Sequence, residues 1–444
     1  MDIILGAYDL LNQLLGWPLI IMVAGSGILC TLVLDFVQIR YFFRSWRYMF
    51  TPSKTVGKQD MSPLQAFMST LNANLGNGSI AGMATAIYAG GPGAAFWVLV
   101  TGIVLASVRF SEVYLSTYFG AYAKDRQTLG GPMLYLRSVI GGNALSWFYG
   151  ASCFFFSLMV GNAIQANTVR LSLEKTWNTP TLPVAIALML FMVYVVLGGA
   201  QRVAHLSQAL VPLKIGVFFI SCIGVLAYHY QSLLPALALI LKHAFTPMAA
   251  AGGALGFGVQ QAIRFGMSRS IMANESGLGT AAILYSATGS TEPIRDAIIS
   301  MVSTFISTIV CFLIMLAIIA SGVWNNGLTS SALTISAYQT VFGHYGAWIV
   351  TFLSVSFGIG VAVAFVYISR ECWLFLSKGR YPHVVSVLYC LTTFIGALVP
   401  VNAIWLLAES LNALMLVINL FGIVCLLYLV RAGLKNFMRQ ERAE

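Results

Sequence analysis

Eleven long apolar stretches run along the 444-residue chain, separated by short polar connections. A helix that crosses a bilayer needs about 20 mostly apolar residues, so this pattern predicts eleven membrane-spanning helices. The expected spans run approximately over Trp17–Val37, Pro63–Ala89, Ala94–Phe119, Leu145–Leu171, Leu182–Leu197, Ser207–Tyr230, Ala250–Tyr285, Ile294–Val323, Tyr345–Ser369, His383–Val399 and Ala403–Val430.

Two of these stretches are interrupted by Gly, Asn and Ser, at Asn72–Ser79 and at Asn274–Gly279. Glycines loosen a helix, and a loosened helix exposes N–H and C=O groups that hydrocarbon cannot satisfy. Secondary transporters place such broken helices where they line substrate and ion sites. The alternative is a close-packed helix pair built on small residues. The position of both interruptions inside apolar spans favours a pair of broken helices around a binding site.

The two interruptions also indicate an internal repeat. With the first helix set aside, two groups of five helices remain, and each group opens with an interrupted segment. Five helices entered from opposite sides of the membrane are inverted relative to one another. We therefore expect an all-α polytopic membrane protein. Residues 1–61 form an extra N-terminal helix and a basic loop, 62–231 the first repeat, and 232–444 the second, inverted repeat and a tail.

Composition and charge agree with this fold class. Hydrophobic residues make up 59% of the chain and charged residues 9%, against about 25% charged residues in globular proteins. The net charge of +10 does not indicate a nucleic-acid partner, because the basic residues gather in short loops. No Lys or Arg precedes Arg40, so no cleavable signal peptide is expected.

The loop charges predict an orientation. Threading eleven helices places most basic residues on one side, and the positive-inside rule makes that side cytoplasmic. We therefore expect the N-terminus outside and the C-terminus in the cytoplasm. The basic residues on the cytoplasmic side are Arg40, Arg44, Arg47, Lys54, Lys58, Lys124, Arg126, Arg137, Arg202, Arg295, Arg370, Lys378, Arg380, Arg431, Lys435, Arg439 and Arg442, and those on the other side are Arg170, Lys175 and Lys242.

The two breaks carry the chemistry that the sequence offers. Half-helix N-termini present unpaired N–H groups that suit a carboxylate, and carbonyls freed on the other side of a break suit a cation. Together they could hold a zwitterion between the breaks. No His or Cys is expected to face them, so the sequence does not predict an enzyme. The seven cysteines are interpreted as small buried hydrophobes.

Several polar side chains inside the spans have two interpretations each. Asn162 and Gln165 share a helix face and belong either to the site or to hydrogen bonds between helices. Arg109 and Glu112 form either a structural ion pair or a proton relay. Glu275, beside the second break, either orients the unwound backbone or titrates.

The blocks GNGSIAGMATAIYAGGPGAAFW, RFSE, LGGPMLYL, QANT and AIRFGMSRSIMANESGLGTA resemble the bacterial alanine/glycine:cation symporter family. The resemblance extends from about Val37 to the last helix. It implies a leucine-transporter-like fold, two five-helix inverted repeats preceded by one extra helix, in the bacterial inner membrane. It also implies sodium-driven uptake of alanine or glycine, with no other cofactor. We expect a monomer in the lipid bilayer. The rival class is an amino-acid sensor that does not transport.

The resemblance also implies a set of site residues. Phe365 stands where the family usually has a Trp that closes the pocket. The coupling ion is expected between the carbonyls of Asn72 and Leu75 and the ninth helix near Gly360 and Val361. The substrate residues implied are Asn74, Gly76, Asn77, Gly78, Ser79, Gln165, Asn274, Gly277, Gly279 and Phe365.

This chain departs from the family pattern at both parts of the site. The first break reads Gly76-Asn77-Gly78-Ser79 where the family usually has Gly-Thr-Gly-Asn. On the ninth helix, Gly360 and Val361 stand where the family usually has Thr and Ser. Hard cations prefer oxygen ligands, and those hydroxyl oxygens are missing here. Two coupling modes therefore remain open: sodium, or a proton or no ion, with Glu275 as the first candidate proton carrier.

Overall fold

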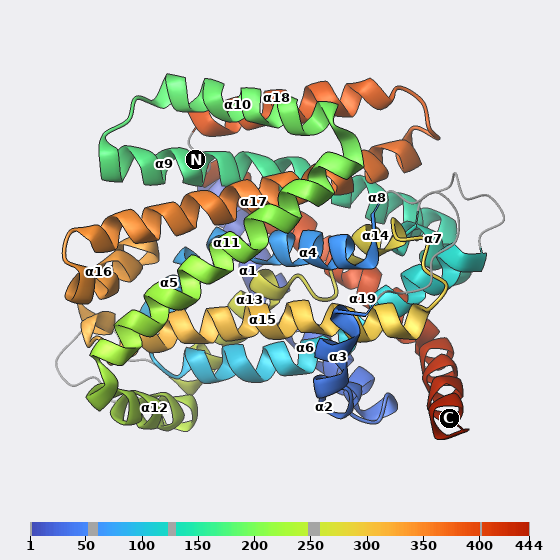
Figure 1. Ribbon diagram of the computed structural model, residues 1–444, viewed down its shortest axis with the longest axis horizontal. Coiled ribbons are helices and arrows are strands. Elements are labelled where there is room, and N and C mark those ends of the chain that lie inside the picture. The colour runs from blue at the N-terminus through green and yellow to red at the C-terminus, as the bar shows by residue number, and fades with distance from the viewer. Residues whose placement is uncertain (1, 52–60, 123–129, 247–257, 400–401, 444) are drawn as a thin grey trace.

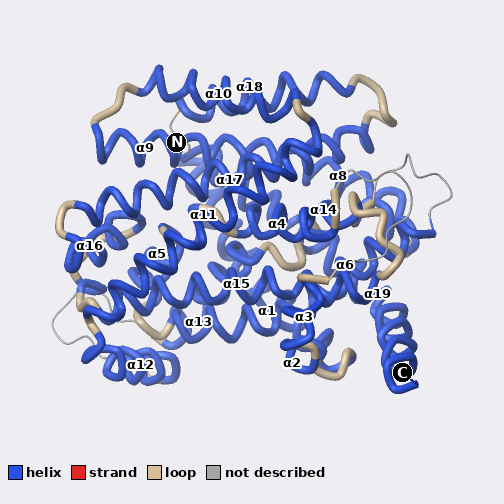
Figure 2. Tube along the Cα trace, in the orientation of Figure 1, coloured by secondary structure: helices blue, strands red, loops and turns tan. Residues whose placement is uncertain are grey.

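The computed structural model describes residues 2–51, 61–122, 130–246, 258–399 and 402–443, and Figure 2 shows only helices and loops in these ranges. The helices of the first half are α1 (Asp2–Val33), α2 (Val37–Arg40), α3 (Phe42–Met49), α4 (Pro63–Asn74), η1 (Asn77–Ser79), α5 (Ala81–Gly90), α6 (Ala94–Tyr122), α7 (Pro132–Tyr135), η2 (Leu136–Ser138), α8 (Gly142–Leu158), η3 (Met159–Ala163), α9 (Ile164–Trp177), α10 (Thr181–Leu197) and α11 (Gly199–Tyr228). Those of the second half are α12 (Tyr230–Phe245), α13 (Val259–Asn274), α14 (Thr280–Ser286), α15 (Pro293–Ala320), η4 (Val323–Asn325), α16 (Ser330–Phe342), α17 (Tyr345–Leu376), α18 (Pro382–Leu398) and α19 (Asn402–Ala443).

The spans expected from the hydrophobic pattern are present. Within the described residues, seven helical segments are long and apolar enough to cross a membrane, and α10 and α18 are shorter apolar helices. The remaining two expected spans are the broken pairs α4–α5 and α13–α14. Most of them run from left to right in Figure 1, and α11 crosses the others obliquely.

Several details differ from the expected spans. The first part of the expected seventh span, 250–257, lies outside the described residues, as do Lys54, Lys58, Lys124 and Arg126. Helices α12 and α16, which no long apolar run predicted, lie at one end of the molecule (Figure 1). The fourth span contains a π-helical turn, η3, between α8 and α9.

The first break has a clear local cause. Ser62 caps the start of α4 through a capping box with Gln65, and the helix ends at Asn74. At Leu75 the backbone leaves helical geometry with φ −85° and ψ 76°, and a single 3-10 turn precedes α5. Gly76 belongs to the unwound segment, as the sequence predicted.

The second break depends on left-handed backbone. Glu275, Gly277 and Gly279 have φ of 51°, 90° and 85°, in the region that glycine adopts most readily. The N–H of Leu278 turns back to the carbonyl of Glu275, and α14 starts again at Thr280. The chain is therefore unwound in both interrupted spans.

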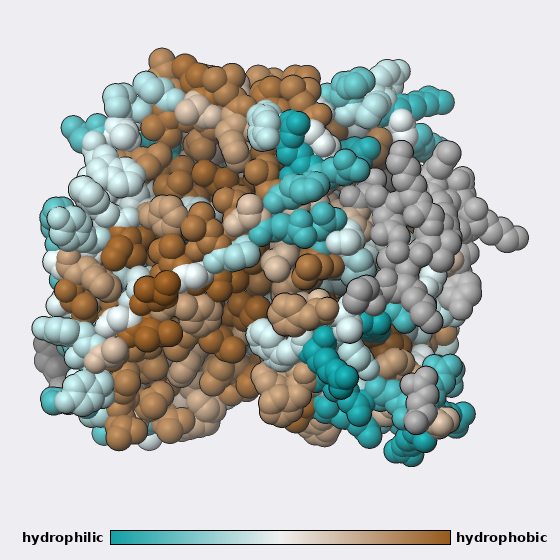
Figure 3. All heavy atoms as spheres, in the orientation of Figure 1, coloured by the Kyte–Doolittle hydropathy of each residue, from teal (hydrophilic) through white to brown (hydrophobic). Residues whose placement is uncertain are grey.

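The surface has the distribution of a membrane protein. In Figure 3 hydrophobic residues cover the centre of the visible face, and polar residues gather toward the ends of the helices and along part of α11. The long axes of the helices run from one polar end to the other, as they do when helices cross a bilayer.

Candidate functional site

A cavity of about 460 Å³ opens from one end of the molecule toward the first break. Its outer part includes exposed Lys175 on α9, and its inner part includes Asn77 and Gly78 of the break. The other residues that line it are Ala81, Gly82, Thr85, Ile164, Gln165, Asn167, Thr168, Leu171, Ser172, Thr176, Arg269, Met272, Ser330, Ser331, Ile335, Val350, Thr351, Ser354 and Glu409. The cavity therefore joins solvent at this end to the interrupted span.

Three side chains form a hydrogen-bonded floor, defined here as Asn77, Gln165 and Ser354. Ser354 Oγ donates to Asn77 Oδ1 at 2.6 Å, and Asn77 Nδ2 donates to Gln165 Oε1 at 3.2 Å. The three come from the break, from α9 and from α17, so one small network joins three spans. Ser354 was not among the site residues expected from the sequence.

The other residues of the first break differ in whether they face the cavity or are buried. Gly78 is exposed to the cavity, and a Cβ added there would meet no atom within 4 Å. Gly76 packs against Val361, since a Cβ at Gly76 would lie 2.8 Å from Val361 Cγ2. Ser79 and Asn74 are buried and do not line the cavity. Only Asn77 and Gly78 of the expected first-break residues line the cavity.

The second break is closed by protein side chains. Glu112 Oε2 accepts hydrogen bonds from the N–H groups of Gly277 and Gly279, at 3.0 and 3.1 Å. Asn419 Nδ2 donates to the Gly277 carbonyl at 2.8 Å, and Tyr149 Oη donates to the Leu278 carbonyl at 2.6 Å. In this structure Gly277 and Gly279 bind these side chains and do not line the large cavity.

Arg109 connects the two breaks. Its guanidinium pairs with Glu112 at 2.8 Å, and both side chains are fully buried. It also donates to Asn74 Oδ1 at 3.4 Å and to the backbone carbonyl of Asn274. These contacts fit the structural interpretation of the Arg109–Glu112 pair, because each partner holds backbone or amide groups of an unwound segment.

Asn274 and Glu275 end α13. Asn274 Nδ2 donates to Ser270 Oγ, and its Oδ1 accepts from Thr308 Oγ1, both at 3.2 Å. Glu275 Oε2 accepts from Thr280 Oγ1 at 2.8 Å, and the residue borders a small cavity of about 40 Å³ that is lined in part by Glu409. The hydrogen bond between Thr280 and Glu275 joins the two sides of the second break, so it helps to hold the unwound backbone.

The remaining expected side chains on α17 and in the fourth span have separate environments. Phe365 is buried against Gly161 of η3, where an added Cβ would lie 2.3 Å from its ring. Asn162 donates to the Tyr389 carbonyl and accepts from Thr393, so it ties η3 to α18. Of the two amides Asn162 and Gln165, only Gln165 lines the large cavity.

A lysine lies at the position expected for the coupling ion. Lys214 Nζ of α11 donates to the carbonyls of Leu75 at 3.1 Å and Asn72 at 3.3 Å. A Cβ added at Gly360 would lie 2.6 Å from the same Nζ. The expected ion ligands are therefore brought together, but around an ammonium group.

Lys214 was not among the site residues expected from the sequence, although a lysine inside an apolar span is a reason to expect a functional position. It lies in the apolar run LVPLKIGVFF, far from any loop. A charged residue inside a span is costly and marks a functional position by default.

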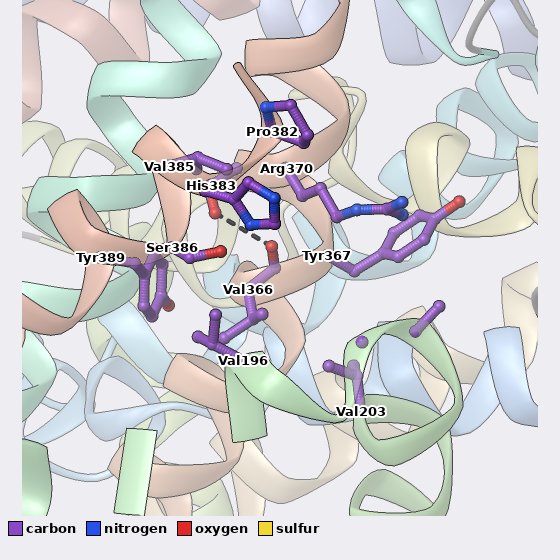
Figure 4. Close-up of a pocket in the computed structure, with 13 residues that line it drawn as sticks. Val196, Val203, Val366, Tyr367, Arg370, Pro382, His383, Val385, Ser386 and Tyr389 are labelled. Carbon is purple, nitrogen blue, oxygen red and sulfur yellow. Dashed lines mark hydrogen bonds between the residues drawn. The ribbon is translucent and has the colours of Figure 1, made fainter. Parts of the chain in front are cut away.

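A second cavity, of about 220 Å³, lies among α17, α18 and the α10–α11 junction (Figure 4). Tyr367, Arg370, His383 and Tyr389 border it, and Ser369 Oγ donates to the Val366 carbonyl at 3.0 Å. It contains none of the expected site residues.

Comparison with known proteins identifies the family. The model of the sodium:alanine symporter family matches residues 2–444. The chain belongs to the sodium:alanine symporter family. Its membership confirms the resemblance seen in the sequence blocks, and the family is one of membrane transporters.

Relatives within the sodium:alanine symporter family cover nearly the whole chain. An uncharacterized transporter of Haemophilus influenzae is 33% identical, over 99% of this chain and 97% of its own length. The sodium/alanine symporter AgcS of Methanococcus maripaludis is 29% identical, over 96% and 95%. The probable sodium/glutamine symporter GlnT of Bacillus subtilis is also 29% identical, over 96% and 88%.

Solved structures confirm the fold. A substrate-bound, outward-open Na⁺-coupled sialic acid symporter superposes with a TM-score of 0.57 at 14% identity, covering 90% of this chain and 86% of its own. A manganese transporter of Eremococcus coleocola gives a TM-score of 0.50 at 13% identity, covering 86% and 81%. The predicted transporter fold is therefore correct.

Proposed function

We propose that this chain takes up a small neutral amino acid, with alanine and glycine as the first candidates, by alternating access around the two breaks. The observation that carries the proposal is the cavity that runs from exposed Lys175 to the Asn77–Gln165–Ser354 floor at the first break. Polar groups at the inner end of a cavity, at an interrupted span, are the arrangement in which secondary transporters bind substrate.

The chemistry of the cavity supports a polar ligand without net charge. Asn77 and Gln165 offer amide donors and acceptors, and Gly78 leaves backbone open to the cavity. Arg269 and Glu409 also line the cavity, on α13 and α19. Charges of both signs suit a zwitterion better than a substrate with a net charge. A relative described as a sodium/alanine symporter supports alanine, and one described as a probable sodium/glutamine symporter adds glutamine to the substrates to be tested.

The charge distribution supports uptake from the side where the cavity opens. Lys175 lies at the cavity end, near the end of α9. Arg44 in α3, Arg137 in η2 and Arg295 at the start of α15 lie toward the opposite end of the molecule (Figure 1). By the positive-inside rule the cavity then faces outward, with the N-terminus outside and the C-terminus in the cytoplasm of a bacterial inner membrane.

Two coupling modes follow from the sequence. Sodium is the ion named in the family description. The alternative, a proton or no ion, is favoured by the contact of Lys214 with the carbonyls of Asn72 and Leu75.

Uptake into proteoliposomes tests the proposal. Purified protein is reconstituted and given labelled alanine, glycine or glutamine under an inward sodium gradient, an inward proton gradient, or neither. We expect saturable uptake of at least one of the three, competed by the unlabelled compound. Absence of uptake in every condition, from protein that still unfolds cooperatively, would contradict amino-acid transport.

A further inference from the structure

Lys214 lies at the end of a half-helix. In an unbroken helix the carbonyls of Asn72 and Leu75 would accept from the N–H groups four residues later, of Gly76 and Ser79. Here the N–H of Gly76 binds the Asn74 carbonyl, and that of Ser79 binds the Gly76 carbonyl. The break therefore frees two carbonyls, and Lys214 Nζ binds both.

Every described contact of this ammonium group suits a cation. The two carbonyls belong to the C-terminal turn of α4, which is the negative end of the helix dipole. The ring of Phe357 lies 5.2 Å from Nζ and presents a further cation-binding surface. Asn72 Oδ1 is buried and accepts no hydrogen bond from the described residues, so a third acceptor lies beside the group.

No negative charge competes for the lysine. In the ranges that the structure describes, no carboxylate forms an ion pair with Lys214, which is fully buried. A buried positive charge without a counter-ion is costly, so the freed carbonyls and the aromatic face are what make the position tolerable. The same groups are what a coupling cation would need.

Helix α17, the ninth expected span, leaves room for the lysine side chain. Gly360 leaves open the space that a side chain would fill, because an added Cβ would lie 2.6 Å from Lys214 Nζ and 2.2 Å from Asn72 Oδ1. Val361 adds no oxygen ligand. The ammonium group of Lys214 therefore lies where α17 offers no hydroxyl ligand for an ion at Gly360 or Val361.

We propose that the ammonium group of Lys214 takes the place of the coupling sodium ion between α4 and α17, so that transport by this chain proceeds without sodium. The residues at this position do not fit a sodium ion, because Lys214 Nζ already binds the two carbonyls that would hold it and Gly360 and Val361 carry no hydroxyl. The inference rests on the proposed amino-acid transport. It makes Lys214 a residue that determines ion specificity.

The first test uses the wild-type protein. The amino acid taken up in the proteoliposome assay is measured again with all sodium replaced by potassium or choline at constant ionic strength. We expect the same initial rate within about twofold. A rate that falls by about tenfold or more without sodium would overturn the inference while leaving amino-acid transport intact. Thermal unfolding of the detergent-solubilised protein supplies a second measurement: the Tm should be equal in sodium and potassium, and a sodium-specific increase would overturn the inference.

The second test removes the charge. Lys214→Met keeps an unbranched apolar chain but no ammonium group, and we expect uptake to fall by about tenfold or more. Leu213→Met, on the exposed neighbouring position, is the matched control and should retain the wild-type rate. If Lys214→Met fails to fold, Lys214→Arg serves instead, and we expect its uptake also to be independent of sodium. A folded Lys214→Met protein that transports at the wild-type rate would overturn the role of the ammonium group.

Discussion

The carboxylate of Glu112 accepts a hydrogen bond from the backbone N–H of Gly277, a residue in a different span at the second break. The same oxygen accepts from the N–H of Gly279, and the other oxygen pairs with Arg109. The unwound backbone is thus satisfied by a buried charge pair in place of helical hydrogen bonds.

We expect Glu112→Gln to destabilise the protein strongly. The substitution leaves the Arg109 charge buried without its partner, and breaking a buried pair costs about 3 kcal/mol or more. Thermal unfolding in detergent measures the effect. Glu174→Gln is the control, because its pair with Arg170 is partly exposed and exposed pairs contribute about 1 kcal/mol or less. Equal Tm changes in the two variants would contradict a structural role for the Arg109–Glu112 pair.

Gln165→Ala should weaken substrate affinity. Gln165 lines the cavity and accepts from Asn77, so its loss removes one floor amide and the acceptor that orients another. We expect KM for the transported amino acid to rise by about tenfold. Asn162→Ala is the matched control: its amide binds α18, so stability should fall while KM stays within about twofold. A Gln165→Ala protein with the wild-type KM would exclude this side chain from the site.

Gly360→Ser should impair transport more than Gly78→Ala. The added Cβ at Gly360 has no room beside Lys214, whereas a Cβ at Gly78 meets open space. We expect uptake to fall by about tenfold in Gly360→Ser, and to recover in part when Lys214→Ala vacates the space and the new hydroxyl supplies an oxygen ligand. The recovered uptake should depend on sodium. If Gly360→Ser alone transports normally, the proposed pairing of Gly360 with Lys214 is wrong.

A further prediction concerns the pH dependence of stability at the contact between Tyr41 and the C-terminal helix α19. Tyr41 Oη donates to Glu441 Oε2 at 3.2 Å, and burial, followed by the Glu441 charge, raises the pKa of Tyr41 from 10.0 to about 12. A raised pKa means that the stabilisation is complete below pH 10.0 and is lost as the pH rises through about 12. The Tm difference between wild type and Tyr41→Phe should therefore be constant below pH 10.0 and shrink above it. A difference that already shrinks below pH 9 would contradict the contact, and Tyr381→Phe, on an exposed tyrosine, is the control.

The sequence predicted the spans and the two breaks, because each depends on the residues of one short segment. Apolar runs define spans, and the Gly- and Asn-rich segments 72–79 and 274–279 define the two breaks, because lipid cannot satisfy loose backbone. Helices α12 and α16 were not predicted, since they are short and lie at the end of the bundle, where no apolar run of membrane length is needed. The π-turn η3 has no local sequence marker that would separate it from an α-helix.

The sequence could predict which residues belong to the breaks, but it could not predict which distant side chains contact them. Asn77, Gly78 and Gln165 line the cavity, and the first break and one polar helix face had pointed to them. Their role in binding substrate stays a prediction. That Glu112 would bind Gly277 and Gly279, or that Lys214 would reach Leu75, depends on how distant spans pack, and spacing along the chain carries no information about it.

The central claim, that a small amino acid crosses the membrane by way of the cavity at the first break, is tested most directly by comparing wild type with Asn77→Ala in one reconstituted uptake assay. Asn77 lies at the centre of the floor, between Gln165 and Ser354. The account predicts saturable uptake of alanine, glycine or glutamine by the wild type, and a loss of about tenfold or more in an Asn77→Ala protein that still unfolds cooperatively. Uptake that is the same in the two proteins, or absent from a folded wild type, would contradict it.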